Sequence, residues 1–320
     1  MQPFTVPSAR PTSRGTANPS ILARLRRLLA ALVRVVVVIV VVVVAAISWI
    51  GSERAIHPAI EAYHWTPAAY PSLVPQDISF LGTGGARLVG RFFPGRTHAT
   101  IVVSHGYGGN QNGVLPWAVF LHQAGYSVLT YDMRGAGRSG GGAVTLGALE
   151  QFDLVAAVDY LVSRPDVDKT RIGALGISLG GAVTILGAAR DRRIRAAVDD
   201  CGFSDAPRVI DASFTHFIGL PAFPFSPLAV RLAELRTGQQ IDTVRPVDMI
   251  ASISPRPILI IHGLADSVVP VDNSRRNFAA ARQPKELWLV PGAGHGESRA
   301  IAGAAYTHRV VAFFRQALGS

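Results

Sequence analysis

The pattern of apolar and polar residues begins with one long apolar run near the N-terminus. The run covers residues 28–50 and is interrupted only by Arg34 and Ser48. At about 1.5 Å per residue, a helix of this length matches a hydrocarbon core of roughly 30 Å. Valine is abundant here and favours strands, but the run is far longer than a strand. We therefore predict one N-terminal transmembrane helix.

From about residue 77, short apolar runs alternate with stretches of helical periodicity. Strands are expected at residues 78–81, 88–93, 100–104, 127–131, 171–177, 196–199, 257–261 and 286–290. Helices are expected at residues 114–123, 149–164, 179–190, 272–282 and 302–318. This alternation predicts an α/β fold with a mostly parallel eight-stranded sheet and helices on both faces. In such a sheet the substrate site lies at the carboxyl ends of the strands.

The remaining segments complete the predicted domain organisation. Residues 1–27 form a basic arm for which we expect disorder, and residues 51–76 form a connector rich in proline. The aromatic residues of the connector are expected either at the lipid interface or packed on the domain. They are Tyr63, Trp65 and Tyr70.

The domain itself occupies residues 77–320, and within it residues 202–252 break the alternation with Phe- and Pro-rich sequence. We expect this segment to be either a small lid over the site or an insertion that buries its own aromatic side chains.

The net charge of +10 is concentrated before the apolar run and in its first residues. Residues 1–34 contain six arginines and no acidic residue, so they supply +6 of the +10. The positive-inside rule then puts the N-terminus in the cytoplasm and the domain on the exported side of a single-pass protein. The alternative is a secretory signal cleaved near residues 46–48, which would release the domain. The body shows no cluster of basic and aromatic residues, which argues against nucleic acid as a partner.

The segment 173–181 places Ser178 between Gly176 and Gly180, where a strand pattern gives way to a helical one. A serine in G-x-S-x-G at such a junction forms a nucleophile elbow, in which the glycines allow a tight turn and the serine Oγ is exposed above the sheet. Ser178 is therefore the candidate nucleophile.

A glycine-rich loop, residues 105–110, follows the strand expected at 100–104. An oxyanion hole in this architecture takes one backbone N–H from this loop and one from the residue after the nucleophile. We assign these donors to Tyr107 and Leu179. His105 precedes the turn, and we expect it to fix the loop rather than to act as a base.

Two later loops supply an acid and a base. Asp266 lies a few residues past the strand expected at 257–261, and His295 lies past the last strand. The chain order Ser178, Asp266, His295 is the nucleophile, acid, base order of this fold. Asp205 also follows a strand and is kept as the alternative acid.

Two further motifs indicate no cofactor and no metal. Residues 135–140 match G-x-G-x-x-G, but a dinucleotide site requires a helix directly after this motif, and the helical pattern begins only near Leu149. The single cysteine, Cys201, rules out an internal disulfide and is expected to be a small buried residue at a strand end.

Five runs in this order carry a resemblance to a known family. They are HGYGGN at 105–110, YDMRGAGRSGG at 131–141, GISLGG at 176–181, HGLADSVVP at 262–270 and PGAGHGE at 291–297. They resemble the Bem46-like and prolyl-oligopeptidase-related serine hydrolases of the α/β-hydrolase superfamily. The resemblance implies that Ser178, Asp266 and His295 form a catalytic triad and that residues 131–135 form a structural turn.

The sequence thus predicts a membrane-anchored serine hydrolase that cleaves small-molecule carboxylic esters through an acyl-enzyme, without a cofactor. The alternatives are an acyltransferase, thioesterase or peptidase with the same triad, or a tethered binding domain without activity. The acyl group, the leaving group and the oligomeric state stay open, because they depend on pocket shape and surface and not on the motifs.

Overall fold

The computed structural model describes residues 19–60, 62, 69–71 and 73–319. The expected arm up to residue 18 and the connector residues Tyr63 and Trp65 lie outside this range. The chain divides into two compact units, residues 1–46 and 47–320. Helix α1, Pro19–Ile56, contains the apolar run and is the one described helix that is long and apolar enough to cross a membrane.

Helix α1 is longer at both ends than the predicted span of residues 28–50. It begins at Pro19, so residues 19–27 are helical where a disordered arm was expected. Leu, Ala and Arg, which fill this stretch, are strong helix formers and extend a helix that the apolar run already nucleates. The first residues of the expected connector, 51–56, are also helical, because Ile56 is buried in the core of the second unit.

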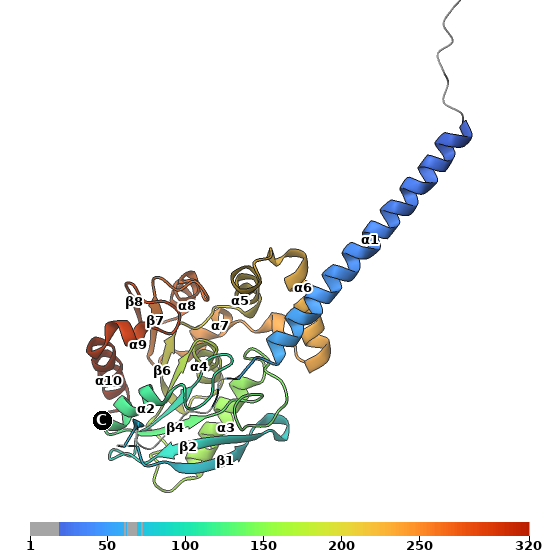
Figure 1. The fold of residues 1–320 in the computed structure, drawn as a ribbon. Coiled ribbons are helices and arrows are strands. Elements are labelled where there is room, and N and C mark those ends of the chain that lie inside the picture. The colour runs from blue at the N-terminus through green and yellow to red at the C-terminus, as the bar shows by residue number, and fades with distance from the viewer. Residues whose placement is uncertain (1–18, 61, 63–68, 72, 320) are drawn as a thin grey trace, which may run out of the picture. The chain divides into compact units, whose positions relative to one another are not determined.

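The second unit is built on an eight-stranded sheet in the order β1-β2-β4-β3-β5-β6-β7-β8 (Figure 1). The pairs β1–β2 and β2–β4 are antiparallel, and all the other pairs are parallel. The strands are β1 Gln76–Leu81, β2 Arg87–Phe93, β3 Thr100–Ser104, β4 Ser127–Tyr131, β5 Ile172–Ile177, β6 Ile194–Asp200, β7 Ile258–Gly263 and β8 Lys285–Val290. The predicted α/β-hydrolase fold with a mostly parallel eight-stranded sheet is confirmed.

Two apolar clusters lie on opposite faces of this sheet. One cluster joins the sheet to α3, α4 and part of the lid, and the other joins it to α2 and α10. Helices therefore cover both faces, as the alternation predicted (Figure 1). The helices are α2 Leu115–Gln123, α3 Glu150–Ser163, α4 Leu179–Arg190, α8 Asp272–Ala280, α9 Ser298–Ala302 and α10 Ala304–Leu318.

The segment 202–252, called the lid below, is mostly helical. Its elements are α5 Ala206–Ser213, η3 Phe214–Ile218, α6 Ala222–Thr237, η4 Ile241–Thr243, α7 Pro246–Met249 and η5 Ile250–Ile253. It connects β6 to β7, two strands that are adjacent in the sheet. The loops after β3, β5, β6, β7 and β8 meet at the same edge, because these strands are parallel.

Candidate active site

Ser178 lies at a tight turn between β5 and α4. Its backbone has φ 57° and ψ −119°, a conformation that L-residues rarely adopt and that costs about 1–3 kcal/mol. A Cβ on Gly176 would overlap the carbonyl group of Gly180, and a Cβ on Gly180 would overlap that of Ser104. The two glycines of the motif are therefore required by close backbone packing.

His295 connects the serine to a carboxylate. Its Nε2 lies 2.8 Å from Ser178 Oγ, and its Nδ1 lies 2.8 Å from Asp266 Oδ2. Asp266 follows β7 and His295 follows β8, so two neighbouring parallel strands bring the two loops together. The structure thus unites the three residues that the sequence selected from loops far apart in the chain.

The carboxylate of Asp266 is fully buried, and both of its oxygens have partners. Oδ1 accepts hydrogen bonds from the backbone N–H groups of Val268 and Val269, at 2.9 and 2.8 Å. Burial raises the pKa of Asp266, but the contacts with His262 and His295 outweigh burial and hold the pKa well below its usual range. Asp266 is therefore negatively charged at neutral pH.

His262 is a second histidine beside this carboxylate, and the sequence analysis gave it no role. Its Nε2 lies 2.7 Å from the Val269 carbonyl oxygen and 3.3 Å from Asp266 Oδ2, while its Nδ1 lies 2.5 Å from Ser274 Oγ. Burial lowers the pKa of His262, but the contacts with Asp266 and the Val269 carbonyl outweigh burial and raise it. The signal that could have identified His262 is its four-residue spacing from Asp266 at the end of a strand.

The expected oxyanion donors face no competing acceptor. Within the described chain, neither the Tyr107 nor the Leu179 backbone N–H donates a hydrogen bond. Leu179 is the first residue of α4, where the helix leaves such groups free. In the loop with Tyr107, a Cβ on Gly106 would lie 3.4 Å from Ser178 Cβ and 3.9 Å from its Oγ, so this loop passes next to the serine.

His105 holds that loop in place. Its Nε2 accepts a hydrogen bond from the Met133 backbone N–H at 3.0 Å, so Nδ1 carries the proton and donates to the Gly106 carbonyl at 2.7 Å. This arrangement ties the loop after β3 to the turn after β4. It agrees with the expectation that His105 fixes the loop.

Asp205, the alternative acid, has a different position. Its Oδ1 caps α5 by accepting a hydrogen bond from the Arg208 backbone N–H at 3.0 Å, and its Oδ2 lies 3.2 Å from Ser204 Oγ. None of its contacts among the described residues is with His295. In this structure Asp266, and not Asp205, is therefore the carboxylate that contacts His295.

Cys201 is a fully buried free cysteine at the end of β6, close to the acid and the base. The ligand atoms of Cys201, Asp266 and His295 all lie within 4.8 Å of one another, a spacing that could hold a metal ion. Burial raises the pKa of the thiol well above its usual range, with smaller contributions from neighbouring carboxylates. At neutral pH the thiol is therefore protonated.

The turn after β4 has a structural role. The side chain of Asp132 accepts hydrogen bonds from the backbone N–H groups of Gln111 and Arg138, at 2.8 and 2.9 Å. Arg134 forms a buried ion pair with Asp153 of α3. The G-x-G-x-x-G motif lies in this turn, and α3 begins only at Glu150, so the motif lacks the helix that a dinucleotide site needs.

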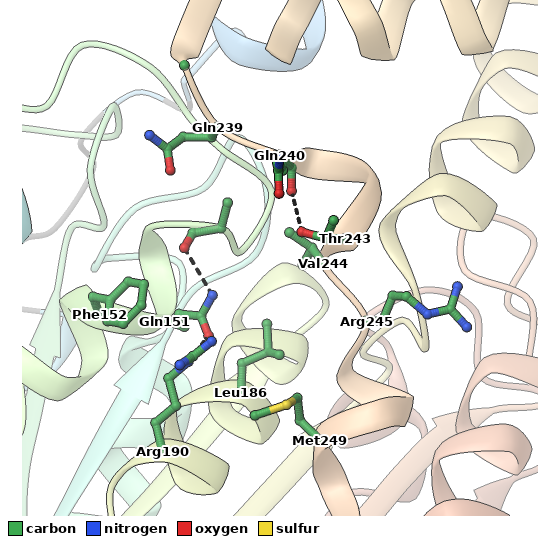
Figure 2. Close-up of a pocket in the computed structure, with 12 residues that line it drawn as sticks. Gln151, Phe152, Leu186, Arg190, Gln239, Gln240, Thr243, Val244, Arg245 and Met249 are labelled. Atoms are coloured by element: carbon green, nitrogen blue, oxygen red, sulfur yellow. Dashed lines mark hydrogen bonds between the residues drawn. The ribbon is translucent and has the colours of Figure 1, made fainter.

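A cavity of about 330 Å³ lies between the lid and helices α3 and α4 (Figure 2). Gln151 and Arg190 line it, and Arg190 Nε donates to Gln151 Oε1 at 2.5 Å. Ser178, Asp266 and His295 do not line this cavity. It is therefore separate from the serine site.

Comparison with known proteins places the chain in a family. Residues 115–320 match the model of the prolyl oligopeptidase family. Protein YfhR of Salmonella typhimurium is 32% identical over 248 residues, which are 75% of this chain and 79% of YfhR. Protein Rv2307c of Mycobacterium tuberculosis is 33% identical over 251 residues, which are 74% of this chain and 80% of Rv2307c.

Solved structures give the same fold. The esterase Pf2001 of Pyrococcus furiosus is 26% identical, with a TM-score of 0.70, over 82% of this chain and 98% of the esterase. Acetyl xylan esterase 1 of a Thermoanaerobacterium species is 21% identical, with a TM-score of 0.61, over 85% of this chain and 93% of that enzyme. The second likeness bears on the fold alone.

Proposed function

The chain belongs to the prolyl oligopeptidase family and is a hydrolase of the α/β-hydrolase superfamily, and from this premise we propose that it is a membrane-anchored serine esterase. The observation that carries the proposal is the continuous contact from Ser178 Oγ through His295 to Asp266, with 2.8 Å at each step. Such a chain of contacts is what nucleophilic catalysis by serine requires.

In the first half-reaction, Ser178 Oγ attacks the acyl carbon of the ester while His295 Nε2 accepts its proton. Asp266 orients the imidazole through Nδ1 and stabilises the positive charge that forms on it. The negative charge on the ester oxygen is stabilised by the Tyr107 and Leu179 N–H groups, each contributing about 3 kcal/mol in the transition state. The intermediate then collapses, the alcohol leaves with the proton from His295, and the acyl group stays on Ser178.

Water completes the reaction. His295 takes a proton from a water molecule, whose oxygen attacks the acyl carbon of the acyl-enzyme. When this second intermediate collapses, Ser178 regains its proton from His295 and the carboxylic acid leaves. No step needs a metal or an organic cofactor.

The preference for esters is supported by the likeness to the Pf2001 esterase, which is 26% identical. The family's name instead points to amide bonds, so peptide cleavage is the second candidate. The two differ in the leaving group, because an amine must be protonated before it leaves, whereas a phenolate or alcohol leaves more easily. Product analysis with matched p-nitrophenyl esters and p-nitroanilides therefore separates them.

The test uses the full-length protein in detergent, a fluorophosphonate probe and p-nitrophenyl esters of several chain lengths. Wild type is expected to be labelled and to turn over at least one ester, whereas Ser178→Ala does neither. Absence of labelling in folded wild type, or labelling of Ser178→Ala, would contradict the proposal.

The anchor is proposed from the length and hydropathy of α1 and from the arginines that precede the run. The N-terminus lies in the cytoplasm and the catalytic unit on the exported side. Protease added to right-side-out vesicles should digest the catalytic unit, and an alkaline carbonate wash should leave the protein in the membrane. Release by the wash would instead indicate a cleaved signal.

A further inference from the structure

The last turns of helix α1 are fastened to the lid. Ser48 is fully buried, and its Oγ donates to the Phe225 carbonyl at 3.2 Å. Arg236 of α6 pairs with Glu53, and its guanidinium group lies 4.7 Å from the centre of the Trp49 ring. These contacts join residues more than 170 positions apart in sequence, since Ser48 and Phe225 are separated by 177. Figure 1 shows α6 beside the C-terminal end of α1.

A close packing contact accompanies these polar ones. A Cβ on Gly51 would lie 2.6 Å from the Phe214 ring, so the aromatic ring of the lid rests directly on the helix backbone. Phe214 is itself buried. The lid and the helix end therefore form one packed structure.

The same helix end also contacts the loop of the proposed oxyanion hole. The Tyr107 hydroxyl group donates to the Arg54 carbonyl, and a Cβ on Gly108 would lie 3.1 Å from the Ala59 carbonyl oxygen. The Val144 backbone N–H donates to the Ile56 carbonyl at 2.8 Å. One short segment of chain thus touches both the lid and the site.

Large apolar side chains of the lid stay exposed near this junction. Phe217 of η3 is 66% exposed, Phe223 of α6 is 79% exposed and Leu235 is 81% exposed. Phe223 is two residues from Phe225, which receives the bond from Ser48, and Trp49 is itself 52% exposed. Exposed large apolar side chains on elements that pack together can contribute to a surface that contacts another apolar phase.

The predicted span, residues 28–50, ends inside the segment that contacts the lid. Ser48 and Trp49 lie among its last three residues, and they contact Phe225 and Arg236. With the proposed anchor ending at residue 50, a lid attached to Ser48 and Trp49 would lie at the membrane surface, where Trp and Phe side chains are favoured. The bilayer is therefore the apolar phase that the exposed residues fit.

We propose that the lid contacts the bilayer through Phe217 and Phe223, and that the site takes its substrate, an ester of a long-chain fatty acid, from the membrane. This inference rests on the proposed function and deepens it, because it names the substrate class of the same site. A long acyl chain is held in the bilayer, and the lid and helix end lie between the bilayer and the loop with Tyr107.

The contact itself is tested without any activity measurement. The one native cysteine, Cys201, is buried, so Phe217→Cys in the full-length protein can be labelled selectively with an environment-sensitive fluorophore. In phosphatidylcholine proteoliposomes we expect brominated phosphatidylcholine to quench this label. The matched control is Leu81→Cys, because Leu81 is 70% exposed but belongs to β1, on the side of the second unit away from the lid (Figure 1). Equal quenching at both positions, or none at position 217, would overturn the proposal.

The substrate class is tested by kinetics in the same proteoliposomes. We expect Phe217→Ser with Phe223→Ser to lower hydrolysis of membrane-dissolved 4-methylumbelliferyl oleate about tenfold, through the loss of the proposed contacts of the two aromatic side chains with the bilayer. Hydrolysis of soluble p-nitrophenyl butyrate and fluorophosphonate labelling should be unchanged, and Leu81→Ser should change neither substrate. An equal loss on both substrates, or no loss on either, would contradict the proposal. If the label at position 217 is quenched but wild type hydrolyses no ester, then the proposed function fails while the membrane contact stands.

Discussion

The carboxylates at the ends of β6 and β7 are all buried, yet their surroundings differ sharply. Asp266, after β7, has partners for both oxygens and lies beside two histidines. Asp199 and Asp200, which end β6, each have one oxygen that accepts no hydrogen bond within the described chain. The remaining oxygens accept from the Gly202 N–H and the Tyr306 hydroxyl group, both at 2.8 Å.

The difference appears directly in the ionisation of the groups. Burial raises the pKa of Asp199 to about 7 and that of Asp200 to about 6, whereas the histidines hold the pKa of Asp266 well below its usual range. Burial alone therefore does not suit a carboxylate to the role proposed for Asp266. A buried carboxylate stays negatively charged when both of its oxygens accept hydrogen bonds and a histidine that can carry a positive charge lies beside it.

The largest effect is expected from comparing Asp266→Asn with Asp200→Asn. The amide at position 266 no longer holds His295 in the productive tautomer, so kcat should fall about 10⁴-fold. Asp200→Asn should keep kcat within about tenfold, because Asp200 does not contact His295 through a hydrogen bond. Ester turnover by purified protein measures both, with Ser178→Ala as the inactive control. Equal losses would mean that the two carboxylates do not differ in role.

The contributions of Asp200 and Asp266 to folding stability should depend on pH with opposite signs. The folded-state pKa of Asp200 is about 6, above the ordinary 3.8, so its folded state binds the proton more tightly. Wild type then loses stability as pH rises from about 4 to 7, on the order of 3 kcal/mol from this group, and Asp200→Asn removes that loss. For Asp266 the pKa in the folded state is lowered. The carboxylate therefore adds to the free energy of unfolding above about pH 4, and this stabilisation is lost as pH falls.

Urea unfolding of wild type and the two variants between pH 4 and 8 measures this contrast. The stability of Asp200→Asn relative to wild type should increase with pH, because the buried carboxyl group is removed. That of Asp266→Asn relative to wild type should vary in this range only through His262, whose pKa the carboxylate no longer raises. Parallel curves for Asp200→Asn and wild type would show that burial does not shift this carboxyl group.

Substitution of His262 tests the role of Asp266 while the carboxylate itself is kept. His262→Phe removes the contacts with the Val269 carbonyl and with Asp266, and kcat should fall about 10- to 100-fold with KM for the ester unchanged. His262→Gln keeps a donor in the same position and should recover part of the loss. If both variants instead show a lower kcat, a higher KM and a lower melting temperature, the substitutions damage the loop in general.

The smallest effect is expected at Tyr306. Its hydroxyl group donates to Asp200 and accepts from Trp117 Nε1 at 2.9 Å, and Tyr306→Phe leaves both groups without this partner. The free energy of unfolding should fall by about 1–2 kcal/mol, more at pH 8 than at pH 5 because the carboxylate is then charged. Urea unfolding of wild type and Tyr306→Phe at the two pH values measures this difference. A loss of unfolding free energy that is the same at both pH values would contradict the link to Asp200.

The sequence by itself predicted the fold, because the signals for it are local. Short apolar runs, helical periodicity and the glycines around Ser178 are set by neighbouring residues, and the observed strands agree with the expected ones within a few residues, whereas α1 extends beyond its expected span at both ends. The order of Ser178, Asp266 and His295 along the chain selected three residues that the fold then brings within hydrogen-bond distance. A parallel sheet makes this possible, since its strand ends lie at one edge.

Only the tertiary structure decided which carboxylate meets His295 and what surrounds it. In the sequence Asp205 is another acidic residue that follows a strand, but in the structure its side chain caps the N-terminus of α5. His262 and Tyr306 become partners of buried carboxylates through contacts that no local pattern encodes. The contact between Ser48 and Phe225 likewise joins segments far apart in the chain. Such pairings depend on how whole helices and strands pack, and packing is a property of the folded chain and not of any one segment.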